Sequence, residues 1–352
     1  MRRPSPNPAK TRLFNLIGEI AYRSGVTGLV HRLNPRKDLL ILTYHNIISP
    51  PFLKRIAGIE DFQEPFSRQM AYIARYMSPI SEEQLLKYLV MGSADKGGLL
   101  PHNPVLVTFD DGYGDIYDAA LPVMKKLGIP GLVFVTANCI GKNESIWPNR
   151  LYYYFDQTKI QSCIVPDFLQ VQAGKSIGLE SNHQRHRAAL LCLNGLKLLP
   201  SKERKESMGK LALALDIDPS IDPWDKLPML NWDQLRSLNK QGISVGSHGL
   251  SHEIMTRLTP EELISEVQGS KEMIERKLDS SVTGFAYPNG GRMDHDSKTA
   301  RALKEAGYRY AMTFQPGVYS NKADPFQIPR WAFYDRGISA FALHLARLSL
   351  RS

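Results

Sequence analysis

One stretch of the chain, residues 104–113, constrains the fold more than any other. It begins with a proline, continues as an apolar run with β-branched residues, and ends in Asp110, Asp111 and Gly112. This pattern predicts a buried parallel strand whose C-terminal end delivers two adjacent carboxylates into a cleft. One carboxylate could then bind a cation while the other faces a substrate. The alternative is a surface turn in which both aspartates cap Gly112 and the next helix, since Asp-Gly is a common turn signal.

A second apolar run, residues 242–247, is followed by His248 and His252. Two histidines four residues apart can face one point if the segment forms a single helical turn. Two imidazoles and one carboxylate make a three-ligand site for a divalent metal, with a coordination position left open for water. That arrangement is typical of catalytic rather than structural metal sites. The sequence therefore predicts that the aspartate pair and the histidine pair meet at one cation.

Five further apolar runs have the length and composition of strands, and helical segments separate them: 38–44, 131–136, 282–287, 308–314 and 326–333. Seven strands that alternate with helices predict a parallel sheet with right-handed crossovers, closed or nearly closed. His45, Tyr287, Pro288 and Arg330 all lie at or near the C-terminal ends of predicted strands. In a βα barrel that face carries the chemistry. We therefore expect an α/β barrel with an active site at this face.

The alternation of strand and helix is lost at about residues 138–228, and this region predicts a mostly helical insertion. Aromatic residues gather at its start, including Trp147 and residues 152–155. They could line a sugar-binding cleft or form a small core of the insertion itself. Outside the insertion, Ser81 and Thr259 have the sequence signature of helix caps. We therefore divide the chain into an N-terminal segment, 1–37, and a catalytic barrel, 38–352, that carries the insertion.

The net charge of +9 lies almost entirely in residues 1–37, which carry +7. The same segment has an amphipathic helical pattern, so it predicts a helix on an anionic membrane surface or a helix packed over the barrel with its basic face solvated. Aromatic residues do not alternate with the basic ones, and we expect no nucleic-acid partner. Apolar runs are too short to span a membrane and the first one is a poor secretory signal. The expected location is the cytoplasm, at the inner face of the membrane.

Three motifs of this chain resemble those of the polysaccharide deacetylase family, the carbohydrate esterases with a NodB-like domain. They are Thr108–Tyr113, His248–His252 and Phe285–Gly290. The resemblance implies a distorted (β/α)7 barrel that removes acetyl groups from N-acetylated sugars. It also implies a divalent metal, usually zinc, with cobalt, nickel or manganese as alternatives. Its ligands would be Asp111, His248 and His252.

The resemblance also assigns roles around the metal. Asp110 would be the general base, and the backbone N–H of Tyr113 would hold the oxyanion, with Tyr287 and Pro288 facing the substrate. Many members place an arginine in the third motif, where this chain has Ala286 to Pro288; Arg330 is the expected substitute that pairs with Asp110.

A general acid is the remaining role. Many members of the family supply it from a late Leu-x-His motif, and the nearest counterpart here is Leu343-His344. His45 resembles instead the arrangement of the permuted-motif subgroup, the deacetylases of poly-N-acetylglucosamine type. We expect His45 to be the acid that protonates the leaving amine.

The expected substrate is a glycan or lipid-linked glycan precursor of a surface polysaccharide. Three other hypotheses stay open on sequence alone. The chain could be an amidase of the same fold that acts on a small non-sugar amide, or a sugar-binding protein without catalytic activity. A phosphatase, suggested by the strand that ends in two aspartates, gives no reason for the histidine pair.

Overall fold

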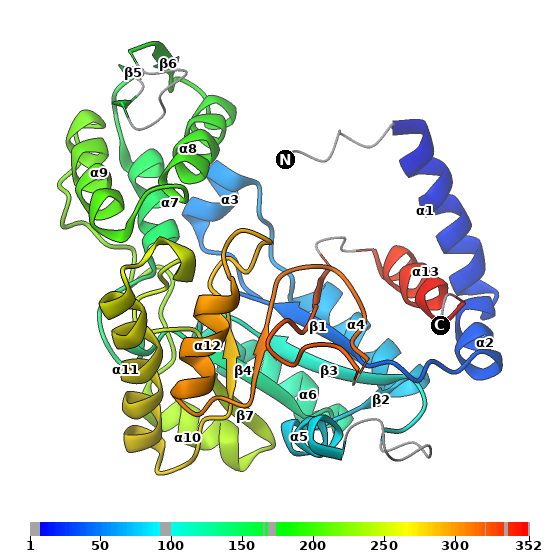
Figure 1. The fold of residues 1–352 in the computed structure, drawn as a ribbon. Helices are drawn as coiled ribbons and strands as arrows, with labels where there is room; N and C mark the ends of the chain where they lie inside the picture. The colour runs from blue at the N-terminus through cyan, green and yellow to red at the C-terminus, as the bar shows by residue number, and fades with distance from the viewer. Residues whose placement is uncertain are drawn as a thin grey trace.

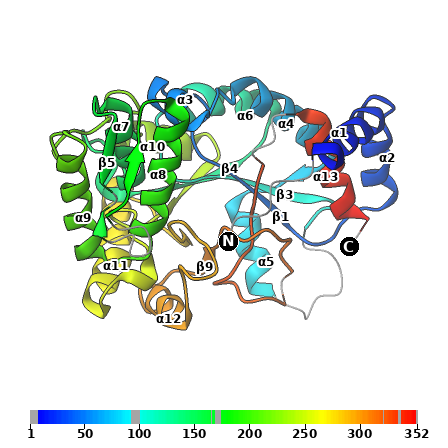
Figure 2. The same cartoon turned by 90° about the horizontal axis from the view of Figure 1, so that it is seen from above.

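The core of the protein is an eight-stranded parallel sheet that curls into a half-barrel (Figures 1 and 2). The computed structural model describes residues 8–91, 100–164, 166–167, 174–320, 322–333 and 337–350. The strands follow the order β10-β1-β3-β4-β7-β8-β9, and β2 pairs with β3 beside this path. Their bounds are β1 (Leu40–Tyr44), β2 (Ser78–Pro79), β3 (Pro104–Phe109), β4 (Gly131–Val135), β7 (Ile243–Ser247), β8 (Gly284–Ala286), β9 (Tyr310–Met312) and β10 (Trp331–Ala332).

The segment before β10 links the two edge strands of the curled sheet, β9 and β10. Met312 of β9 forms a parallel bridge with Ile328, and the Arg330 N–H donates to the Gln315 carbonyl at 2.9 Å. At the next residue the same segment pairs with β1, where Trp331 lies opposite Leu42. The predicted parallel barrel is therefore confirmed, and all seven predicted strands form. The eighth, β2, has only two residues and is too short to leave a sequence pattern.

Helices surround this sheet (Figure 1), and two of them, α5 and α11, begin at the predicted caps. In α5 the Ser81 hydroxyl accepts from the Gln84 N–H at 3.3 Å, and Thr259 forms a capping box with Glu262. Both contacts satisfy backbone groups that a helix start leaves unpaired. The helices outside the insertion that cover the sheet are α4 (Gln63–Tyr76), α5 (Glu82–Met91), α6 (Leu121–Leu127), α10 (Trp232–Lys240), α11 (Pro260–Leu278) and α12 (Ser297–Glu305).

The helix after β3 departs from its prediction at its first turn. We expect an α-helix from about Asp115 to Leu127, but residues Ile116–Ala120 form a π-helical turn before α6 begins. The Leu121 N–H bonds to the carbonyl of Ile116, five residues back. Pro122 has no N–H and so cannot continue an α-helical ladder at this point. A π turn next to a functional segment is a frequent exception to helix regularity.

The described part of the insertion, residues 138–228, contains the helices α7 (Trp147–Gln157), α8 (Asn182–Leu196) and α9 (Ser201–Ala214), and an antiparallel pair, β5 (Ser162–Ile164) with β6 (Ser176–Gly178). Leu151, Phe155 and Leu193 lie in a separate hydrophobic cluster between these helices. Part of the aromatic sequence thus forms a core of its own. The start of α7 lies elsewhere, because Pro148 and Asn149 line the cavity described below.

At the opposite side of the molecule, α1 (Pro8–Arg23) and α2 (Val26–Leu33) pack against α13 (Ile338–Ser349) (Figures 1 and 2). One face of this pair is apolar and open to solvent: Leu16 is 58% exposed, Ile20 61% and Leu33 69%. Within the described ranges, every helix is too short or too polar to cross a membrane. Residues 1–7 of the predicted N-terminal segment lie outside these ranges.

Candidate metal centre and active site

The turn after β3 presents its two aspartates in different directions. Asp111 has a φ of 71° and Gly112 a φ of 90°, both in the left-handed region. Asp is one of the few residues besides glycine that adopts this conformation at moderate cost, and such positions are concentrated at functional sites. The turn leaves both Asp110 and Asp111 buried. The predicted strand with two carboxylates at its end is therefore confirmed.

The two histidines reach the same place by a different local structure from the one expected. Residues 248–252 form an irregular loop rather than a helical turn, since Gly249 has a φ of 80° and His252 a φ of 57°. The loop backbone bonds to its surroundings instead of to itself: Glu266 accepts from the Leu250 N–H at 2.7 Å, and Trp147 Nε1 donates to the His252 carbonyl at 3.1 Å. These outside partners replace the helical hydrogen bonds.

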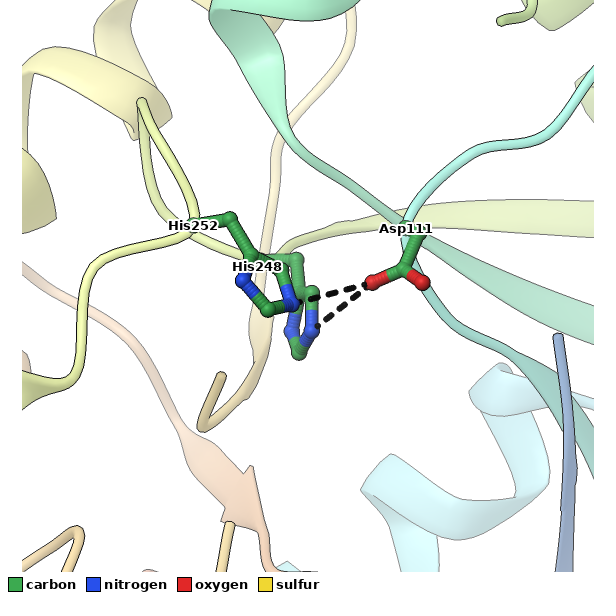
Figure 3. A group of neighbouring side chains, drawn as sticks. All are labelled: Asp111, His248 and His252. Atoms are coloured by element: carbon green, nitrogen blue, oxygen red, sulfur yellow. Dashed lines mark ion pairs between the residues drawn. The ribbon is translucent and has the colours of Figure 1, made fainter. Parts of the chain in front are cut away.

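Asp111, His248 and His252 converge on one point (Figure 3). Asp111 Oδ1 lies 3.4 Å from His248 Nε2 and 3.2 Å from His252 Nε2. Ligand bonds of 2.0–2.1 Å in a tetrahedron place two ligand atoms about 3.3 Å apart. These spacings therefore fit a small divalent cation, and of the aspartate pair it is Asp111 that meets the two histidines.

The hydrogen bonds of this group also fit a cation. His248 Nδ1 lies 2.7 Å from the Ala286 carbonyl, so Nδ1 carries the proton and Nε2 faces Asp111 with a lone pair. Asp111 Oδ1 is buried and has no hydrogen-bond partner. A carboxylate oxygen and imidazole lone pairs that face one point need a positive charge between them.

Asp110 is held in another way. Arg330 Nη1 and Nη2 donate to its two carboxylate oxygens, each at 2.7 Å, and Arg330 Nε donates to the Thr313 carbonyl at 3.0 Å. Both side chains are buried. Burial raises the pKa of Asp110, but Arg330, with smaller contributions from His248 and His45, outweighs burial and lowers it. The predicted pairing of Arg330 with Asp110 thus occurs, in the bidentate geometry that arginine favours.

The three candidate metal ligands and Asp110 line a cavity of about 300 Å³. Of the remaining residues expected at the site, the cavity is lined by His45, Tyr113 and Tyr287. The Tyr287 ring stacks on His295 with centroids 4.8 Å apart. Pro288 is buried and is not among the lining residues.

The two histidines considered for proton donation lie in different places. His45 lines the catalytic cavity and an adjoining, more apolar cavity of about 430 Å³, and its ring meets the Phe314 ring edge-on at 5.8 Å. His344 lies in α13, where its ring packs against Trp331 at 4.6 Å and Phe333 at 5.1 Å. It is absent from the lining of both cavities. Its position in the cavity therefore makes His45, rather than His344, the better candidate for the proton donor.

Asn149 and Lys197, two polar residues that sequence reasoning missed, also reach the site from the insertion, as does Trp147. Asn149 Nδ2 donates to the Tyr113 hydroxyl at 3.2 Å, Lys197 lines the cavity, and Trp147 bonds to the backbone of His252. No strand-end pattern marks these residues, because they come from helices of the insertion. Only the aromatic residues at the start of α7 gave a partial signal.

The chain belongs to the polysaccharide deacetylase family. The sequence profile of that family matches residues 98–187 and 201–311, more than half of the chain. The same region contains the turn after β3 and the loop with both histidines, so the match includes all three predicted metal ligands.

Individual relatives are distant. YxkH of Bacillus subtilis (strain 168), which is named after the same family, is 24% identical over 245 residues; the match covers 70% of this chain and 51% of YxkH, so the chain spans about half the length of this relative. Among solved structures, the Streptococcus pyogenes deacetylase PplD in complex with acetate is 16% identical, with a TM-score of 0.55 over 89% of this chain and 98% of PplD. IcaB from Ammonifex degensii is 18% identical, with the same score and the same coverage. The two structures support the fold.

Proposed function

We propose that the protein hydrolyses the acetamide of an N-acetylated sugar within a glycan and releases acetate. Family membership supports the reaction class. The observation that carries the proposal is the convergence of Asp111, His248 and His252 beside the Asp110–Arg330 pair in one cavity. A single site thus has three candidate ligands and a separate, ionised carboxylate.

Asp111, His248 and His252 are the proposed metal ligands. A divalent cation at this site would supply Lewis-acid polarisation of the amide carbonyl and a water of lowered pKa. Two imidazoles and one carboxylate suit zinc, and cobalt, nickel or manganese could replace it. Titration of the chelator-treated protein with each ion separates these alternatives.

Asp110 is the proposed general base. It accepts a proton from the attacking water, which requires the ionised carboxylate, and Arg330 favours that form. Arg330 also fixes the orientation of the carboxylate through two parallel hydrogen bonds. The backbone N–H of Tyr113, in the turn next to Asp111, would donate to the oxyanion that forms on the acetyl carbonyl.

His45 is the proposed acid that protonates the leaving amine. We expect His45→Ala to slow turnover by roughly 10²–10⁴-fold, because general acid catalysis contributes about that much. Metal affinity should stay unchanged. His344→Ala is the matched comparison and should leave the rate near that of the wild type. If His344→Ala is the slower variant, the acid role belongs to α13 instead.

We also propose that the substrate is a glycan or lipid-linked glycan precursor of a surface polysaccharide and that the protein works at the cytoplasmic face of a membrane. The exposed apolar face of α1 and α2 and the +7 charge of residues 1–37 favour contact with anionic lipid. Cosedimentation with anionic vesicles should be lost in a Leu16→Glu, Ile20→Glu variant and kept in Leu213→Glu, a control at an exposed leucine of α9. Equal binding by all three proteins, or fractionation to the periplasm, would contradict this location.

The central experiment is acetate release from a panel of N-acetylhexosamine oligomers, before and after chelator treatment. Acetate release that stops with chelator and returns with added zinc supports the proposed reaction. Release from cyclic amides but not from sugars would indicate an amidase for small substrates. Sugar binding without acetate release by the metal-loaded protein would indicate a carbohydrate-binding protein.

A further inference from the structure

Lys197 brings a positive charge into the catalytic cavity from the insertion. It is the first residue after α8, it is half-buried, and it lines the same cavity as Asp110 and His252. The family profile does not extend over this position, since its match is interrupted between residues 187 and 201. Lys197 is therefore a feature of this chain that the family assignment leaves without a role.

The ammonium of Lys197 is fixed by the turn that follows β8. Its Nζ donates to Asn289 Oδ1, and Asn289 Nδ2 donates in turn to Asp294 Oδ2. Asp294 also accepts from the Gly291 N–H at 2.8 Å. The Asn289 side chain therefore lies between the Lys197 ammonium and the Asp294 carboxylate. Among the ion pairs of the described residues, none includes Lys197.

With a divalent cation bound, the side chains that line the cavity would carry an excess of positive charge, because Asp294 is not among them. Asp110 is neutralised by Arg330. The single negative charge of Asp111 would offset only half of a divalent cation, because two neutral imidazoles add none. Lys197 then adds a second excess positive charge, whereas an acetamide is uncharged. Burial also lowers the pKa of Lys197, and the charge of Asp294 opposes this lowering only in part. An anion near Lys197 would therefore stabilise its ammonium form.

We infer that Lys197 binds an anionic oxygen group carried by the substrate next to the acetamide, so that the preferred substrate is an acidic N-acetylated glycan. This inference rests on the proposed deacetylase function. The shared chemistry is a carboxylate, as in a uronic acid, or a phosphate on the sugar. A lysine suits either one, since its ammonium is a compact point charge with three donors.

The test compares three substrates of equal length: a neutral N-acetylglucosamine oligomer, one that carries a uronic acid, and one that carries a sugar phosphate. In the wild type we expect kcat/KM to be about tenfold or more higher for one acidic substrate, in line with a hydrogen bond to a charged group. Lys197→Met should remove this preference by raising KM, and Lys197→Arg should keep most of it. Lys210→Met, at an exposed lysine of α9, is the matched control and should change nothing.

Binding provides a measurement that does not depend on turnover. Calorimetry with the chelator-treated protein should show about tenfold tighter binding of the preferred acidic oligomer than of the neutral one, and Lys197→Met should abolish the difference. If Lys197→Met slows neutral and acidic substrates equally, the lysine only supports the Asn289 turn and the inference is wrong. The same conclusion follows if the wild type shows no preference in rate or binding. A preference in binding without acetate release from any substrate would overturn the proposed function and leave the anion site standing.

Discussion

Two adjacent carboxylates, Asp110 and Asp111, are buried in the same turn and have opposite surroundings. Asp110 is satisfied by protein: Arg330 donates to both of its oxygens at 2.7 Å. Asp111 Oδ1 has no hydrogen-bond donor and instead faces the Nε2 atoms of two histidines. The protein thus supplies hydrogen-bond donors to both oxygens of Asp110, whereas Asp111 Oδ1 is left available to a ligand that the chain does not supply. The satisfied group suits proton transfer and the unsatisfied group suits a cation.

The backbone repeats this contrast. Asp110 ends a regular strand pairing, since its N–H donates to the Tyr44 carbonyl at 3.0 Å. Asp111 and His252 both have a positive φ, which costs free energy for residues other than glycine. The surrounding contacts that hold these conformations therefore also hold the geometry of the proposed ligands.

The largest expected effect comes from removal of the unsatisfied carboxylate. Asp111→Ala should abolish metal binding and acetate release together, because the site loses one of three ligands. We expect a loss of at least about 10³-fold in activity, as for a group on which the other catalytic parts depend. Asp118→Ala, an exposed aspartate of the following helix, is the control and should behave as the wild type. Metal content in Asp111→Ala equal to that of the wild type would show that Asp111 is not a ligand and would contradict the difference drawn between the two carboxylates.

Asp110→Asn should separate the two carboxylates. The asparagine side chain has nearly the shape of aspartate and can keep part of the hydrogen bonding to Arg330. One metal ion per chain should therefore remain bound. Turnover should fall by roughly 10²–10⁴-fold, because the general base is lost. Metal stoichiometry and acetate release, measured on the same sample, check both halves. A near-normal rate would show that Asp110 is not the base.

Removal of Arg330 tests how much folding stability is lost when the Asp110 carboxylate is buried without its partner. Arg330→Met should destabilise the fold by about 3–5 kcal/mol, because it leaves Asp110 buried and unpaired. Urea unfolding of the single variant and of Asp110→Asn, Arg330→Met should show that the double variant recovers part of this loss. A single variant as stable as the wild type would mean that water reaches Asp110 and that the pair is not buried as described.

The smallest expected effect lies outside the site, at His31 of α2, a buried group with one satisfied nitrogen. His31 Nδ1 lies 3.0 Å from Ser349 Oγ, and burial, with a smaller contribution from Arg36, lowers the pKa of His31 to about 4. The unfolded chain takes up a proton near pH 6.5, so stability should be full above that pH and fall as the pH drops toward 4, by up to about 3 kcal/mol. His31→Gln should make this decline shallower, whereas His102→Gln, at an exposed histidine, should not. Urea midpoints from pH 4.5 to 7.5 measure the slope.

Sequence alone predicted most of the barrel because its strands are apolar runs that end in polar residues. Asp110, Asp111, His248 and Arg330 each follow or end such a run, so their meeting at one face follows from the parallel topology. The loop conformation of His252 could not be predicted, because its hydrogen-bond partners lie far away in the chain. Lys197 was missed for the same reason.

The most direct test of the central claim is an anomalous diffraction map of the zinc-loaded protein, recorded on both sides of the zinc absorption edge. We predict one strong peak that lies about 2.0–2.2 Å from Asp111 Oδ1, His248 Nε2 and His252 Nε2. Asp110 should stay paired with Arg330, away from the ion. A peak bound by Asp110, or no peak in this cavity, would contradict the division of roles between the two carboxylates.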